Sequence, residues 1–189
     1  MAKKVCVVLV TYNRLTCLEK LLAQMDETGA KVALPSREDE NYTDRVCLDL
    51  DLEDHNKFWA SLRKQVAPHP LDKETYFVKD MTFEGPLMTL DISKKVGLPD
   101  KDYFIFFDDT DYAYRLAQHT KLIYVTDAKL RRQLAGGNPN RDSAEREYTW
   151  RNYYMMRNNI LFDKRYGKNW KVRHLSPTIM MAHMLVLSK

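Results

Sequence analysis

Cysteine, glycine and long apolar runs are scarce in this 189-residue sequence, and each shortage argues against a class of protein. The three cysteines are Cys6, Cys17 and Cys47, an odd number without a close pair, which argues against a disulfide framework and a zinc site. There are six glycines and no low-complexity tract, so extensive disorder is not expected. A reducing, cytoplasmic setting fits a chain without disulfides.

Two apolar stretches are too short to cross a membrane. The first, within MAKKVCVVLVTYN, has six residues and no small-residue cleavage site after it, so we interpret it as a buried strand rather than a signal peptide. The second, TIMMAHMLVL near the C-terminus, would extend roughly 16 Å as a helix, against about 30 Å of hydrocarbon core.

Positive charge is concentrated towards the C-terminus. Residues 129–173 contain twelve basic and four acidic side chains, a net charge of +8, which leaves −4 for the rest of the chain. Such a region suits an anionic ligand, nucleic acid or an anionic membrane surface. It makes this part of the chain a candidate for peripheral contact with the inner face of a membrane.

Hydrophobic periodicity predicts strands that alternate with helices, followed by a helical tail. Alternation over 45–52 indicates a strand, and apolar spacing over 17–28 indicates a helix that ends at Gly29. Further strands are expected at 30–35, 74–85, 102–107 and 121–127, and further helices at 53–66, 89–97, 109–119, 143–165 and 177–189. The pattern predicts an α/β domain over 1–127 and a helical region over 128–189.

Three carboxylates follow an aromatic run in FFDDTDYAYRL at residues 106–116. A strand that ends at Phe107 would bring Asp108, Asp109 and Asp111 to the carboxyl edge of a sheet, where open α/β sheets bind ligands. One interpretation is structural, because a helix N-terminus stabilises carboxylates. The other is a working site, because adjacent carboxylates raise each other's pKa, which suits a metal site or a general base.

Three segments, in this order, resemble family 2 glycosyltransferases. VVLVTYNR at residues 7–14 is similar to the family's first strand and loop, and FEGPLMTLDISKKVGLPDKDYFIFFDDTDYAYRL at 83–116 is similar to its later block. WRNYYMMRNNI at 150–160 resembles the Tyr-Tyr-x-x-Arg-Asn helix of the galactofuranosyl- and rhamnosyltransferase-like branch. The resemblance implies a GT-A fold, a Rossmann-like mixed sheet flanked by helices, with a C-terminal helical extension.

The resemblance also implies a reaction. Such enzymes transfer a sugar, with inversion, from a nucleotide-sugar such as a UDP- or dTDP-sugar to an acceptor hydroxyl. The acceptor is a cell-surface glycan or a lipid-linked intermediate of cell-wall or polysaccharide biosynthesis. Asp109 would be the general base, and Asp108 and Asp111 would position it or the acceptor. A Mg²⁺ or Mn²⁺ ion would stabilise the departing diphosphate, with ligands that the sequence does not identify.

Matching positions in the other segments extend the expected site. The donor-binding residues implied by the resemblance are Thr11, Tyr12, Arg14 and Arg132. Arg132 stands near the place where the family often has a metal-binding histidine, and an arginine there could neutralise diphosphate directly. The implied acceptor-binding residues are Glu84, Gly85, Trp150, Tyr154 and Arg157.

One part of the family pattern is absent. Between Thr16 and Cys17 the family has further strands and an Asp-x-Asp metal motif, for which this chain has no room. Asp49 and Asp51 have the spacing of that motif, but their alternation with leucines is also that of a strand with a polar face.

Other classes of function remain open beside the transferase. The first is a non-catalytic remnant or interaction module that retains the acceptor half of a transferase fold. A nucleic-acid-binding protein is a second alternative, but no recognised nucleic-acid-binding motif supports it. A metal-dependent hydrolase is a third, but no histidine accompanies the aspartates to complete a metal site. We therefore expect no nucleic-acid partner.

Overall fold

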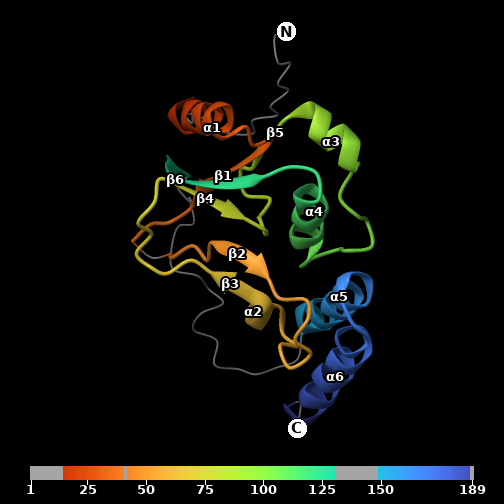
Figure 1. Cartoon of the computed structure of the whole chain (residues 1–189). Helices are drawn as coiled ribbons and strands as arrows, with labels where there is room; N and C mark the ends of the chain where they lie inside the picture. Colours follow the sequence, from red (N-terminus) through yellow and green to blue (C-terminus); the bar gives the residue numbers. More distant parts are fainter. Residues whose placement is uncertain (1–14, 41, 131–148, 188–189) are drawn as a thin grey trace.

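A mixed four-stranded sheet lies at the centre of the fold. A computed structural model of the protein describes residues 15–40, 42–130 and 149–187 (Figure 1). The strand order is β4-β6-β1-β5; β1 and β6 are parallel, and each outer strand is antiparallel to its neighbour. The strands are β1 (Val32–Ser36), β4 (Thr75–Val78), β5 (Leu87–Met88) and β6 (Leu122–Lys129). The predicted mixed α/β architecture is confirmed.

Both faces of this sheet are covered, because the central strands bury side chains on alternate sides. Ala33 and Ile123 pack on one side with Leu21 and Met25 of α1 (Leu15–Thr28). Val32, Leu34, Leu122 and Tyr124 pack on the other side with α3 (Leu90–Val96) and α4 (Asp108–Ala117). Figure 1 shows α1 and α4 on opposite sides of the sheet.

A second, two-stranded sheet lies between this layer and the C-terminal helices (Figure 1). It pairs β2 (Cys47–Leu50) with β3 (Lys64–Val66), and α2 (Ala60–Arg63) immediately precedes β3. The predicted helix over 53–66 is therefore wrong for most of its length. The carboxylate of Asp51 accepts hydrogen bonds from the backbone N–H groups of residues 53 and 54, and such local bonds compete with helix formation.

The predicted strand at 102–107 is also wrong. Phe106 and Phe107 have φ angles of 64° and 66°, in the left-handed region, which no regular strand uses. The side-chain amide of Asn158 donates hydrogen bonds to the carbonyls of Ile105 (2.7 Å) and Phe106 (3.0 Å). These carbonyls therefore bond to a helix that comes fifty residues later, and the acidic cluster follows a tight bend rather than a strand.

Two helices and a π-helical turn form the C-terminal part. They are α5 (Trp150–Tyr166), η1 (Lys171–Leu175) and α6 (Ser176–Leu187). The predicted helix over 143–165 is confirmed from Trp150 onward; its first part lies outside the described residues. Thr149 and Asn152 form a capping box at the start of α5. None of the helices in the described ranges is long and apolar enough to cross a membrane.

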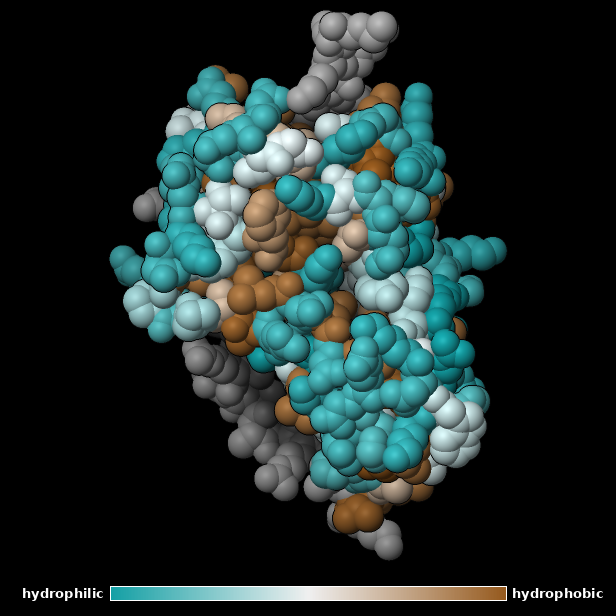
Figure 2. All heavy atoms as spheres, viewed as in Figure 1, coloured by the Kyte–Doolittle hydropathy of each residue, from teal (hydrophilic) through white to brown (hydrophobic). Residues whose placement is uncertain are grey.

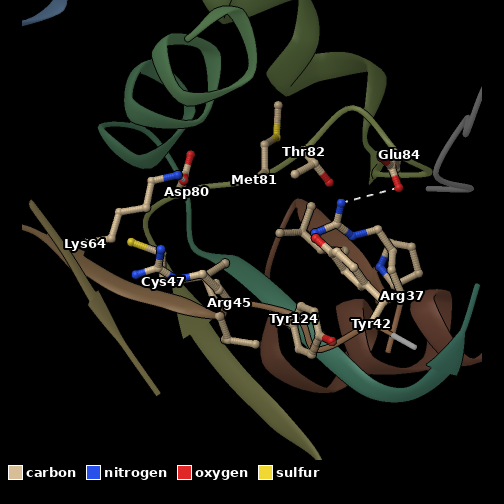
Figure 3. Close-up of a pocket in the computed structure, with 14 residues that line it drawn as sticks. Arg37, Tyr42, Arg45, Cys47, Lys64, Asp80, Met81, Thr82, Glu84 and Tyr124 are labelled. Atoms are coloured by element: carbon tan, nitrogen blue, oxygen red, sulfur yellow. Dashed lines mark ion pairs between the residues drawn. The ribbon is translucent and has the colours of Figure 1, made fainter. Parts of the chain in front are cut away.

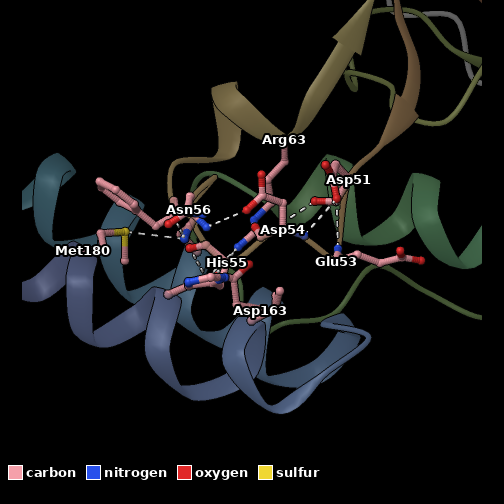
Figure 4. Close-up of polar contacts among 12 residues, drawn as sticks. Asp51, Glu53, Asp54, His55, Asn56, Arg63, Asp163 and Met180 are labelled. Carbon is pink, nitrogen blue, oxygen red and sulfur yellow. Dashed lines mark hydrogen bonds and ion pairs between the residues drawn. The ribbon is translucent and has the colours of Figure 1, made fainter.

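A buried polar centre attaches these helices to the second sheet (Figure 4). The guanidinium of Arg63 binds the carboxylate of Asp163 on α5 (3.0 Å) and the hydroxyl of Ser176 on α6 (3.2 Å). Arg63 is 2% exposed and Asp163 is 1% exposed. Arg63 also donates to the backbone carbonyls of Asp51 and Asp54, so one side chain links three elements.

Candidate functional site

Asp109 lies in the first turn of α4, where the bend at Phe106 and Phe107 starts the helix. Its Oδ1 accepts a hydrogen bond from the backbone N–H of Thr110 (2.8 Å). Burial raises the pKa of the Asp109 carboxyl to about 6, with further contributions from the charges of Asp80 and Asp108. At neutral pH a carboxyl group with this pKa is mostly ionised, and it accepts a proton more readily than an ordinary carboxylate, as a general base does.

The Asp109 carboxylate lines a cavity of about 520 Å³, which we call the Asp109 cavity. Its walls come from the segment before β2, from α2 and β3, from the bend before α4 and from α5. Six of the thirteen lining residues are aromatic or aliphatic and seven are polar or charged: Arg45, Trp59, Ala60, Ser61, Lys64, Ile105, Phe106, Phe107, Asp108, Asp109, Thr110, Met155 and Asn159. Apolar walls on which several polar groups converge are typical of ligand sites.

Figure 2 shows apolar atoms exposed near the middle of the molecule among a largely polar surface. Inside the Asp109 cavity, Asn159 is 1% exposed, and its Oδ1 has no hydrogen-bond partner among the described residues. A buried acceptor of this kind is stabilised by a donor from a ligand or from water.

A second cavity, of about 240 Å³, adjoins the first, and Arg45 and Lys64 line both. We call it the Arg37 cavity (Figure 3). Its polar lining consists of Arg37, Tyr42, Arg45, Cys47, Lys64, Asp80, Thr82, Glu84 and Tyr124. Burial raises the pKa of the Cys47 thiol to about 12, so this cysteine is not a nucleophile at neutral pH.

Asp80 and Lys64 are site residues that the sequence analysis missed. Asp80 is 9% exposed and pairs through Oδ2 with the ammonium group of Lys64, which lines both cavities. Burial alone would lower the pKa of Lys64, but the pairing with Asp80 raises it, so the ammonium stays charged. No signal in the sequence marked Asp80, because it lies within the strand predicted over 74–85; the observed β4 ends two residues earlier, at Val78.

Asp108 joins Asp109 in the same cavity, but Asp111 is directed elsewhere. It is fully buried, and its two oxygens are used by three partners: Arg115 Nε (2.9 Å), Arg165 Nη1 (3.3 Å) and the Tyr166 hydroxyl (2.7 Å). These contacts connect α4 with α5. We therefore assign Asp111 to the attachment of the C-terminal helices rather than to the cavity.

The two expected acceptor residues at 84 and 85 have different positions. Glu84 lines the Arg37 cavity, and its Oε2 lies 3.3 Å from Arg37 Nη1. Gly85 has φ +76°, and a Cβ there would come within 3.2 Å of Leu130 Cδ2 and 3.3 Å of Pro35 Cγ. The turn therefore requires a glycine for its backbone conformation, which explains this residue without a ligand.

Trp150, Tyr154 and Arg157 do not line either cavity. Trp150 and Tyr154 form an exposed aromatic group with Phe104, at centroid distances of 6.4 Å and 5.2 Å from its ring. Arg157 donates from Nη1 to the carbonyl of Asp102 (2.7 Å) and so supports the bend before α4. An aromatic group of this kind offers a flat face to a sugar ring at some distance from Asp109.

The expected donor residues Thr11, Tyr12, Arg14 and Arg132 lie outside the described residues. Within the described ranges no group of three or more histidine, cysteine or acidic side chains is arranged to hold a metal ion. The alternative motif residue Asp51 pairs with Lys57 (2.6 Å) and accepts backbone hydrogen bonds in its turn, and these interactions lower its pKa to about 2.

Fold and site together define a mixed α/β protein with a carboxylate-bearing cavity between its sheet layer and its C-terminal helices. Comparison with protein-family models, with curated proteins and with solved structures finds no match. The geometry of the two cavities and the resemblance of three sequence segments are therefore the features that bear on function.

Proposed function

We propose that this protein is a sugar transferase with a GT-A-type fold, related to family 2 glycosyltransferases, in which Asp109 is the general base. The observation that carries the proposal is the position of Asp109: a carboxylate with a raised pKa on the wall of a ligand-sized cavity. The observed mixed sheet, with helices on both faces, is compatible with such a fold.

In the proposed reaction the acceptor is a glycan or a lipid-linked intermediate. Its hydroxyl proton passes to the Asp109 carboxylate while the oxygen forms a bond to the anomeric carbon of the donor sugar. The bond from that carbon to the diphosphate oxygen breaks, and the nucleoside diphosphate leaves with the electron pair. Attack from the face opposite the leaving group inverts the anomeric configuration. Asp108 and Asn159 lie in the same cavity and would hydrogen-bond acceptor hydroxyls.

The donor side of the proposal depends on residues outside the described ranges. By the resemblance, Thr11, Tyr12, Arg14 and Arg132 would hold the nucleotide-sugar. A Mg²⁺ or Mn²⁺ requirement is likewise a proposal from the resemblance. Because the described residues supply no suitable group of ligands, we assign no step to a metal ion.

One observation favours the alternative, a non-catalytic protein that retains the acceptor half. Helix α1 runs unbroken through Thr16 and Cys17, at the place where the family has its Asp-x-Asp segment. Nucleotide binding separates the two candidates, because a transferase requires a donor site and the acceptor half alone does not.

The test is a transfer assay with a panel of UDP- and dTDP-sugars, in the presence of Mg²⁺ or Mn²⁺, that detects release of the nucleoside diphosphate. We expect Asp109→Asn to lower turnover by a factor of about 10² to 10⁴, the usual contribution of a general base. The control is Asp127→Asn, which removes an exposed carboxylate that lines neither cavity. Turnover that is equal in the Asp109 variant would reject the assignment, and wild-type protein that binds no nucleotide would favour the alternative.

A further inference from the structure

Arg45 differs from the other cations of the two cavities, because no carboxylate among the described residues pairs with it. Arg37 is paired with Asp44 (2.5 Å) and Glu84 (3.3 Å), and Lys64 is paired with Asp80. Arg45 lines both cavities, yet it has no hydrogen bond, ion pair or ring contact within the part of the chain that the structure describes. Its guanidinium offers five donors for a ligand.

Among the three cations that line the Arg37 cavity, Arg45 is the one with no paired carboxylate among the described residues. Three cations line it, Arg37, Arg45 and Lys64, and two carboxylates, Asp80 and Glu84. Each of the two carboxylates is paired with a cation other than Arg45. An anion bound to Arg45 would therefore meet carboxylates whose charge is already compensated.

The same cavity holds a buried hydrogen-bond acceptor without a donor. Oδ1 of Asp80 is inaccessible to solvent and has no partner among the described residues, while Oδ2 binds Lys64. Leaving such an oxygen unpaired is costly, and a hydroxyl group of a ligand would satisfy it. A ligand that carries both an anionic group and hydroxyl groups would thus complement Arg45 and Asp80 together.

We propose that the Arg37 cavity binds an acidic sugar unit, with its carboxylate or phosphate on Arg45 and a hydroxyl on Asp80. The volume of about 240 Å³ is below the range of about 300–1,000 Å³ that is usual for drug-sized ligands, which suits a single ring. Since Arg45 and Lys64 also line the Asp109 cavity, a neighbouring unit of the same acceptor would lie beside Asp109. This step rests on the proposed function, and it specifies the acceptor as an acidic glycan.

The experiment measures binding without any transfer step, by ligand-observed NMR and calorimetry. The probes are methyl β-glucuronide, the matched neutral methyl β-glucoside, and glucose 1-phosphate. We expect the wild type to bind an acidic probe on the order of tenfold more tightly than the neutral one, the contribution of a charge-assisted hydrogen bond. The arm that binds more tightly, glucuronide or sugar phosphate, identifies the anionic group.

Variants locate the preference. Arg45→Gln should abolish the difference between acidic and neutral probes, and this residue is exposed, so its replacement leaves the fold intact. The matched control is Lys94→Gln, which removes one exposed positive charge that lines neither cavity and should keep the preference. Equal affinity for both probes in the wild type, or a preference that survives Arg45→Gln, would overturn the proposal.

Asp109→Asn separates this inference from the proposed function. If Arg45 recognises the acidic group, this variant keeps the preference for the acidic over the neutral probe, because Arg45 is unchanged, whatever its effect on transfer. If the protein transfers sugars but shows no preference for the acidic probe, Asp109 remains the proposed base and only the acidic acceptor is rejected. If the protein prefers the acidic probe but binds no nucleotide, the binding of acidic sugars by the Arg37 cavity is supported and only the transferase activity is rejected.

Discussion

At the scale of the residue, the proposed chemistry depends on the carboxyl group of Asp109, whose environment disfavours its charged form. The folded protein holds the pKa of Asp109 at about 6, against an ordinary value of 3.8, mainly because of burial and then because of Asp80. Enzymes tune acidic groups in this way when a base must work near neutral pH. The bend at Phe106 and Phe107 brings the residue to the cavity wall, so local backbone geometry and proton affinity are linked.

The first prediction at this scale concerns the pH dependence of transfer. Below pH 6 the Asp109 carboxyl is protonated and cannot accept the acceptor proton, so the rate at low substrate concentration should rise through about pH 6 and become level above it. Initial rates from pH 4.5 to 8.5 measure the profile. A profile that is flat across this range would contradict the role of Asp109 as a base.

The same pKa predicts a change in stability. Because the folded pKa is raised, the folded state binds more protons than the unfolded state between pH 3.8 and 6, so the free energy of unfolding falls as pH rises through this window and stays lower above it. Asp109→Asn should relieve this cost, by an amount on the order of 1 kcal/mol after allowance for partial solvent exposure.

Thermal unfolding at two pH values checks this. We expect Asp109→Asn to melt about 2–4 °C above the wild type at pH 7.5, and this difference to shrink to roughly a third at pH 4.5, where only part of the window has been crossed. Asp127→Asn, whose carboxylate is exposed, is the control and should melt with the wild type at both pH values. A variant of Asp109 that melts lower at pH 7.5 would show that the carboxylate stabilises the fold instead.

At the scale of the element, the attachment of the C-terminal helices determines whether the Asp109 cavity exists, because α5 supplies Met155 and Asn159 to its wall. The attachment is polar to an unusual degree. Burial raises the pKa of Asp163 to about 6 in spite of its pairing with Arg63, which shows how far water is excluded. Arg63 Nε and Asp163 Oδ1 have no partners among the described residues.

Removal of one partner of this pair should therefore be strongly destabilising. Arg63→Met leaves a buried carboxylate without its cation, and we expect a loss of about 3–5 kcal/mol in the free energy of unfolding. Lys57→Met, which removes the solvent-accessible partner of Asp51, is the control and should cost far less, because surface ion pairs contribute little to stability. Urea unfolding measures both, and adding Asp163→Leu to Arg63→Met should recover much of the loss. Equal midpoints for the two single variants would contradict this account.

Element by element, the sequence was informative where structure is local. The apolar spacing of Leu21 and Met25 was sufficient to predict α1, and the apolar runs were sufficient for β1 and β6, because one buried face determines each. The aromatic run 102–107 has the composition of a strand, but the carbonyls of Ile105 and Phe106 accept hydrogen bonds from Asn158. The sequence near residue 105 contains no indication of a partner so far along the chain.

At the scale of the whole molecule, the candidate site combines residues that the chain separates widely. The aspartates at 108 and 109 could be selected in advance, because three carboxylates close together are unusual. The sequence could not identify three further lining residues, Lys64, Asp80 and Arg45, because each has the sequence context of an ordinary surface charge. Tertiary contacts bring them around one cavity. The pairing of Asp111 with Arg165 was hidden for the same reason.

Charge asymmetry across the molecule leads to a last prediction. The net charge of +8 over residues 129–173 is accompanied by exposed apolar side chains in the C-terminal part, among them Trp170 (68% exposed) and Val186 (73% exposed). Basic groups beside exposed aromatic and aliphatic ones favour the interface of an anionic bilayer. A transferase that acts on lipid-linked acceptors would benefit from such contact, and we propose that this region binds the membrane surface peripherally.

Vesicle sedimentation tests this contact. We expect binding to vesicles that contain phosphatidylglycerol, little binding to pure phosphatidylcholine, and release as salt rises from about 0.05 to 0.5 M, because screening shortens the reach of surface charges. The variant Lys168→Gln/Lys171→Gln/Arg173→Gln should bind on the order of a hundredfold more weakly, since the attraction of each basic group to the anionic surface adds to that of the others. Lys94→Gln/Lys95→Gln/Lys101→Gln removes as much charge from exposed positions at α3 and just after it, and should bind like the wild type. Equal weakening in both triple variants would mean that total charge, and not the C-terminal region, directs the protein to the membrane.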